Sequence, residues 1–209
     1  MMSQLTRMGF VAALGVATVA PAAAQNPQAF FDQAVDDFRN GRIAESVAGF
    51  DRVVELLPDY APLVWQRGIA LYYAGRYEDC RAQFESHRTV NPNDVENAAW
   101  HFLCVARADS PERAAAELLP VGPDTRVPMH EIYELFRGAL APVEVLLAAG
   151  TRPEARFFAH LYIGLYFEAL GNETDAGKHV AAAAEDRYAG VGGYMHMVAR
   201  VHHEALQAR

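Results

Sequence analysis

Histidine, cysteine, glutamate and tyrosine side chains in the middle of the chain could carry acid–base chemistry. His101 and Cys104 are three residues apart and would share one face of a helix. General acid–base catalysis needs a base, a carboxylate that orients it and a pocket that excludes water. Each of these side chains also has an ordinary packing or capping role, so we expect no catalytic residue. The set that could build such a pocket, kept as the alternative site, is Trp100, His101, His130, Glu131, His160 and Tyr162.

The histidines also raise the question of a metal site. His196 and His203 are seven residues apart and would share a helical face, and Met195 and Met197 flank His196. Thioether and imidazole ligands suit a soft ion such as Cu(I). No pair has the spacing of the zinc motif His-Glu-x-x-His. We therefore favour packed or solvated histidines and expect no metal and no cofactor.

The two cysteines are predicted to form a disulfide. Cys80 lies twelve residues before Pro92, and Cys104 lies twelve residues after it. If Pro92 marks the turn between two antiparallel helices, both side chains reach the same level. Helix axes are about 8–10 Å apart, whereas a disulfide needs Cα atoms within about 7 Å, so both cysteines must face the shared seam. Two buried thiols, or Cys104 as a ligand beside His101, are the alternatives.

The elements that must position these residues follow a 34-residue repeat. Gly41 and Gly75 are 34 residues apart, as are Pro58 and Pro92, and this is the length of a tetratricopeptide repeat. We expect an all-α fold, a superhelix of helical hairpins (an α-solenoid), in one domain over residues 25–209. Its parts are repeats at 27–60 and 61–94, a degraded repeat at 95–119, an irregular insertion at 120–156, a repeat at 157–190 and a capping helix at 194–207.

The residues around the second repeat carry a closer resemblance. The stretch from Gly68 through Tyr72 to Arg76, followed by Asn91-Pro92-Asn93-Asp94, resembles the bacterial NlpI-type periplasmic adaptor family. The unit from Gly164 to Gly171 is similar to that family's last repeat. Members of the family bring a protease and cell-wall hydrolases together and are not enzymes. The resemblance implies a protein or peptide partner, with an envelope protease or cell-wall hydrolase as candidates, whereas the family's lipid-bearing cysteine is absent here.

In tetratricopeptide folds the first helix of each repeat lines a concave groove. Transfer of that register predicts an aromatic groove, in which large rigid side chains would provide contact area at low entropic cost. Packing against neighbouring helices is the alternative for each of them. The predicted groove residues are Phe31, Val35, Phe38, Trp65, Ile69, Tyr72 and Tyr73.

The N-terminus and the charge limit the compartment and the partners. One cation, Arg7, precedes an apolar run of about twelve residues and then Ala22-Ala23-Ala24, which is typical of a secretory signal peptide. We predict cleavage after Ala24, a mature chain that starts at Gln25, and a periplasmic or secreted protein without stable membrane insertion. The net charge of -8 argues against a nucleic-acid partner. The expected function is that of an exported adaptor rather than an enzyme; a small-molecule or metal-binding protein is the alternative.

Overall fold

The computed structural model describes residues 26–208, and every regular element within them is a helix, so the predicted all-α fold is confirmed. Residues predicted to form the signal peptide lie outside the described part of the chain. Over residues 26–208 no helix has both the length and the apolar character that crossing a membrane requires. The elements are α1 (Pro27–Arg39), α2 (Ile43–Leu56), η2 (Pro58–Leu63), α3 (Trp65–Tyr73), α4 (Tyr77–His87), α5 (Val95–Ala108), α6 (Pro111–Ala116), α7 (Met129–Phe136), α8 (Pro142–Ala149), α9 (Pro153–Ala169), α10 (Glu173–Ala183), η3 (Asp186–Tyr188) and α11 (Ala189–Gln207).

The hairpins α1–α2, α3–α4 and α9–α10 turn in the same way. Each turn contains a glycine with positive φ: Gly41 at 70°, Gly75 at 73° and Gly171 at 75°. The amide after each glycine donates to a carbonyl five residues earlier, for example Arg76 N to Leu71 O at 3.0 Å. An L side chain is strained in this left-handed conformation, so glycine is the residue that ends a helix and reverses the chain here.

Two of these hairpins also share a close approach between their helices. A Cβ atom on Gly68 in α3 would lie 2.7 Å from the ring of Phe84 in α4, and one on Gly164 in α9 would lie 2.7 Å from the Val180 side chain in α10. Both glycines stand sixteen residues before the side chain that they admit. Gly68 and Gly164 therefore allow the two helices of their hairpins to approach closely.

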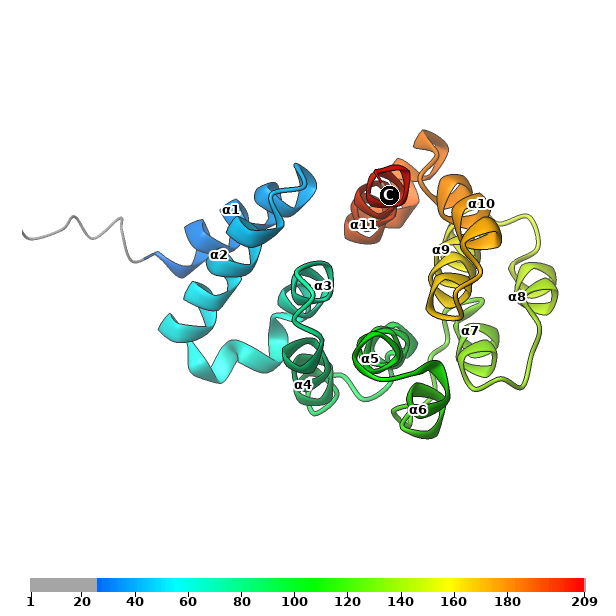
Figure 1. The fold of residues 1–209 in the computed structure, drawn as a ribbon, viewed down its shortest axis with the longest axis horizontal. Coiled ribbons are helices and arrows are strands. Elements are labelled where there is room, and N and C mark those ends of the chain that lie inside the picture. The colour runs from blue at the N-terminus through cyan, green and yellow to red at the C-terminus, as the bar shows by residue number, and fades with distance from the viewer. Residues whose placement is uncertain (1–25, 209) are drawn as a thin grey trace, which may run out of the picture.

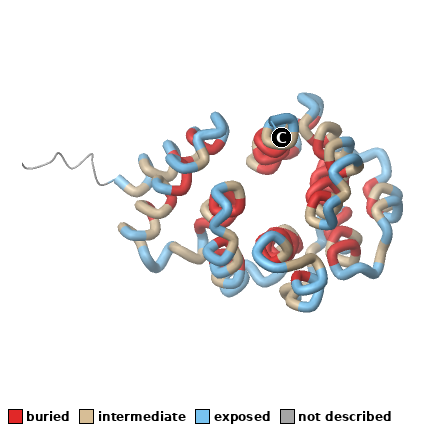
Figure 2. The backbone as a smooth tube through the Cα atoms, in the orientation of Figure 1, coloured by how far each residue is buried: buried red, intermediate tan, exposed pale blue. Residues whose placement is uncertain are grey.

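The helices follow an arc, and the C-terminal helix lies inside it. Figure 1 shows the chain running from α1 through α3, α5 and α7 to α9 and α10, with α11 on the inner side between α1 and α9. Helix α11 contacts α10, α9 and also α1. Buried positions occur mainly where helices face one another, as Figure 2 shows. The helix expected over 194–207 is present, and it lies against the inner side of the arc rather than over one end of it.

Candidate functional site

The candidate site is a partly open cavity of about 220 Å³ between α3, α4 and α5 and the start of α11. We call it the aromatic cavity. Helices α3 to α5 are consecutive in the chain, whereas α11 begins more than eighty residues after the end of α5. The cavity is therefore completed by a distant segment. Its lining residues are Trp65, Phe84, His87, Asp94, Glu96, Asn97, Trp100, Gly192, Tyr194 and Met195.

Four aromatic side chains line the cavity: Trp65, Phe84, Trp100 and Tyr194. Trp65 and Tyr194 meet edge to face with ring centroids 5.0 Å apart, and Tyr194 also stacks on Phe38 at 6.1 Å. On the other side Phe84 and Trp100 are stacked at 6.4 Å. Such pairs hold each other in fixed orientations. The cavity thus presents rings that are already ordered before any ligand enters.

Three polar atoms on lining side chains are buried without a hydrogen-bond partner among the described residues. They are the indole Nε1 of Trp100, the amide Oδ1 of Asn97 and the hydroxyl of Tyr194. Asn97 donates through Nδ2 to the Phe84 carbonyl at 3.2 Å, which assigns Oδ1 as the unpaired acceptor. An unpaired buried polar atom costs about 1–3 kcal/mol. Each of these atoms has almost no accessible surface, so the surrounding side chains enclose it.

His87 adds a further acceptor. Its Nδ1 lies 2.7 Å from the carbonyl oxygen of Pro62, and a carbonyl can only accept, so Nδ1 carries the hydrogen. In the neutral ring this leaves Nε2 as an acceptor.

Carboxylates occupy one side of the cavity. Arg126 contacts three of them: Glu96 at 2.6 Å, Asp94 at 2.7 Å and Asp124 at 2.6 Å. Tyr162 donates to the other oxygen of Glu96 at 2.5 Å. With all of these groups ionised, one guanidinium faces three carboxylates, and this side keeps a net negative charge of two. Asp94 also caps α5 by accepting from the amide of Glu96.

The carboxyl groups differ in their pKa values. Burial and the neighbouring Asp94 raise the pKa of Glu96, against the opposing effect of Arg126 and Tyr162. Burial acts to raise the pKa of Asp124 too, but the hydrogen bonds from Arg126 outweigh it and lower that pKa. The pKa of Tyr162 is raised by burial and by the adjacent Glu96, so its phenol remains a donor.

A second polar group, outside the cavity lining, attaches α11 to the arc. His202 in α11 lies 3.0 Å from the Glu168 carboxylate in α9, and 2.8 Å from the Tyr73 hydroxyl in α3 through its other ring nitrogen. The side chains of His202 and Glu168 are both only 2% exposed. Tyr72 contacts the same Glu168 carboxylate at 3.5 Å. We call Tyr72, Tyr73, Glu168 and His202 the closure network.

Three of the predicted groove residues contact α11. Phe38, Ile69 and Tyr72 are buried, and Phe31, Val35, Trp65 and Tyr73 are half-buried. Phe38 and Trp65 pack on Tyr194 of α11, and Tyr73 bonds to His202 of the same helix. Of this set only Trp65 lines the aromatic cavity.

The residues of the alternative site do not converge. His101 faces Glu85 at 3.4 Å, Tyr162 bonds to Glu96, and His160 faces His179 with their Nδ1 atoms 3.1 Å apart. His130 is exposed and lines a separate open cavity with Asp124, while Glu131 is half-buried. Trp100 alone reaches the aromatic cavity. The predicted groove therefore contributes Trp65 to the aromatic cavity, and the alternative site contributes Trp100.

The histidines and methionines of α11 serve other contacts. His196 Nε2 lies 3.0 Å from the Glu185 carbonyl, and His203 lies 2.9 Å from the Gln207 amide. Across residues 26–208, no three His, Cys, Asp or Glu side chains are grouped so that they could hold a metal ion. Met195 lines the aromatic cavity instead.

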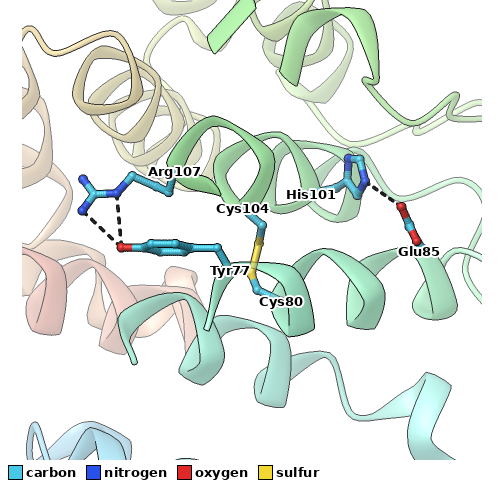
Figure 3. Close-up of a disulfide and its surroundings, with 6 residues drawn as sticks. All are labelled: Tyr77, Cys80, Glu85, His101, Cys104 and Arg107. Carbon is cyan, nitrogen blue, oxygen red and sulfur yellow. Dashed lines mark hydrogen bonds and ion pairs between the residues drawn. A yellow bond between two sulfur atoms is a disulfide. The ribbon is translucent and has the colours of Figure 1, made fainter. Parts of the chain in front are cut away.

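The predicted disulfide is confirmed. Cys80 in α4 and Cys104 in α5 are bonded, with their Cα atoms 5.9 Å apart. Figure 3 shows the bond between two further contacts of the same seam, Arg107 with Tyr77 and His101 with Glu85. The bond removes Cys104 from any ligand role and fixes α4 against α5, which together carry most of the cavity's inner wall. A disulfide is consistent with an oxidising compartment.

Most lining residues could not be found from the sequence. Trp65, Trp100 and Met195 were singled out, but Asn97, Tyr194 and the carboxylates of Asp94 and Glu96 were not assigned to a site. The signal for Tyr194 is the glycine-rich stretch Gly190-Val191-Gly192-Gly193 at the start of α11, which ends with Gly193 at a φ of 52°. That kink turns the rest of α11 into the arc. No protein-family model matches the chain.

Proposed function

We propose that this protein is an exported adaptor that binds a protein partner by admitting one partner side chain into the aromatic cavity. The observation that supports this is the cavity itself: aromatic rings line it, and the carboxylates of Asp94 and Glu96 lie on one side. Binding sites combine apolar walls with a few placed polar groups in this way.

Three further features agree with the proposal. The disulfide stiffens the wall that α4 and α5 provide, so less conformational freedom is lost on binding. The predicted signal peptide and the disulfide fit an oxidising compartment. The resemblance of residues 68–100 to tetratricopeptide adaptors suggests an envelope protease or a cell-wall hydrolase as the partner.

Because α11 fills the inner side of the arc, the proposed contact is one side chain in a cavity rather than a peptide laid along an open groove. The dispersal of the His, Glu and Tyr residues gives no support to an acid–base site. The proposal therefore names Trp65, Trp100 and Tyr194 as the binding residues, with Phe38, Ile69 and Tyr72 as packing residues.

The test is capture of partners from a periplasmic extract, followed by affinity measurement with the purified partner. Trp65→Ala should weaken binding by about 2 kcal/mol or more, the scale of an aromatic hot spot. Tyr60→Ala is the matched control, because Tyr60 is 55% exposed and does not line the cavity. Equal affinity of both variants, each folded by circular dichroism, would remove the cavity from the proposal.

A small molecule is the second candidate, and the volume of the cavity favours it. A volume of about 220 Å³ has room for about seven water-sized groups, which also fits a small polar metabolite. Native mass spectrometry of protein purified from the periplasm tests this. A bound compound that is lost in Trp65→Ala would favour the small molecule, whereas unliganded protein would favour a protein partner.

A further inference from the structure

We infer that the side chain admitted to the aromatic cavity is an arginine, recognised as a guanidinium on an aliphatic stem. This inference rests on the proposed function and specifies its ligand. The chemistry of the lining carries it in three steps: hydrogen-bond polarity, charge and shape.

Acceptors outnumber donors among the lining groups. Asp94 and Glu96 offer carboxylate oxygens, and the neutral form of the His87 ring offers Nε2. The unpaired atoms of Asn97, Trp100 and Tyr194 have almost no accessible surface and are not counted. A ligand that matches this set must bring several N–H or O–H groups. A guanidinium brings five N–H donors and no acceptor.

The charge of the lining points the same way. Asp94 and Glu96 are its acidic residues, and it contains no lysine or arginine. Arg126 sits behind these carboxylates and pairs with both of them, but together with Asp124 they still outnumber it three to one. A carboxylate ligand would be repelled by this side of the cavity, and a cation would be attracted.

The shape suits a planar cation. Trp65 and Tyr194 are half-buried and line the cavity with aromatic surface, and guanidinium groups stack on such rings. A cavity of about 220 Å³ has room for the seven heavy atoms of an arginine side chain beyond Cα. A neutral aromatic side chain would fill the same space but bring no positive charge to Asp94 and Glu96.

The chain contains its own probe for the experiment. Trp65 and Trp100 are its two tryptophans, and both line the cavity, so intrinsic fluorescence reports on occupancy. Wild-type protein is titrated with N-acetyl-arginine amide and with N-acetyl-citrulline amide, which has the same shape but a neutral urea in place of the guanidinium. We expect saturable binding of the arginine compound and binding of the citrulline compound that is at least about tenfold weaker, because the neutral group loses the cation–π attraction.

A charge variant locates the effect. Asp94→Asn keeps an N-cap side chain for α5 and removes one carboxylate from the lining. We expect it to reduce the preference for the arginine compound, whereas Asp79→Asn, which changes an exposed acid paired with Arg76 outside the cavity lining, should leave the preference unchanged. The wild-type comparison stands by itself should Asp94→Asn fail to fold.

The outcomes separate the two proposals. Equal binding of both compounds, or no saturation by the arginine compound at about 1 mM, overturns the arginine assignment. If purified partner still depends on Trp65 in that case, the proposed function survives. If neither compound nor partner responds to Trp65→Ala, both proposals fail together.

Discussion

The seam between α4 and α5 and the closure by α11 join helices in opposite ways. In the α4–α5 seam the partners are close in sequence, spaced evenly around Pro92, and one pair is covalently linked through Cys80 and Cys104. In the closure, Tyr73 and His202 are 129 residues apart and are held by a hydrogen bond. The cavity lies where the two meet, so one of its walls is cross-linked and the other is held by noncovalent contacts alone.

The difference shows that the rigid part of this fold is the α4–α5 seam and that α11 is held less firmly. A short loop costs little entropy to close, and the disulfide removes much of that cost. The contacts of α11 must offset the larger entropy cost of closing a long loop. They do so with buried aromatic area and with the Glu168–His202 pair. Local opening follows the weaker contacts. We therefore expect α11, rather than α4 or α5, to be the first element to separate from the arc.

The largest effect should come from breaking the closure network. Glu168→Ala leaves His202 without the carboxylate in a site where both side chains are 2% exposed. Removal of one partner of a buried pair costs about 3–5 kcal/mol. We expect the unfolding free energy in urea to fall by that amount, and amide exchange to accelerate first over residues 194–207.

The matched control for this variant is Glu55→Ala, which removes an exposed acid paired with Arg52 on α2. It should change stability by less than about 1 kcal/mol. If Glu168→Ala instead accelerates exchange in α4 and α5 as much as in α11, the two regions open together and the comparison fails.

Loss of the cross-link should have the next largest effect. The double variant Cys80→Ala/Cys104→Ala should lose about 3 kcal/mol, because 24 residues separate the two cysteines and the unfolded chain regains that loop's freedom. Urea unfolding with and without reductant measures it. A reductant should destabilise only the wild type, and thiol titration of unfolded, unreduced wild type should find no reactive thiol.

Two tyrosine variants distinguish bonded from unpaired hydroxyls. Tyr73→Phe removes the hydroxyl that contacts His202 at 2.8 Å and should cost about 1 kcal/mol. Tyr194→Phe removes a buried hydroxyl that has no partner within the described residues, so stability should stay the same or rise by up to about 1 kcal/mol. Thermal unfolding of the two variants measures these changes in stability. A loss of stability in Tyr194→Phe would show that this hydroxyl is paired in solution.

The smallest effect should be a pH dependence in another local seam, between α9 and α10. Burial, with the nearby His179 and Arg156, lowers the pKa of His160 from 6.5 to about 4. Between these values the unfolded chain binds a proton that the folded chain does not, so unfolding becomes easier as the pH falls from about 6.5 toward 4. The effect is limited because both rings are partly exposed to water.

Urea unfolding at about pH 7.5 and about pH 5 measures this in wild type and in His160→Gln. The variant should lose part of the pH dependence, and α11 should show no selective opening at the lower pH. An unchanged pH profile in the variant would mean that His160 titrates alike in the folded and unfolded chains.

The sequence predicts contacts between residues that are close in the chain, but it does not predict contacts between distant segments. Glycine spacing and Pro92 mark the hairpins and the level of Cys80 against Cys104, because those contacts depend on helix periodicity and one turn. The position of α11 depends on how turns accumulate over the whole chain and on a kink at Gly193, which no periodicity encodes. The helix itself was expected, but its contacts with Phe38, Trp65 and Tyr73 were not. Both tryptophans were singled out, yet in separate sets.

The order of the elements along the chain determines the order in which the parts of the cavity are made. A protein is made from its N-terminus onward, so the residues of α3, α4 and α5 are synthesised before those of α11. Gly192, Tyr194 and Met195 then complete the cavity. A chain that ends before residue 192 could therefore carry its disulfide and still lack the residues that complete the cavity.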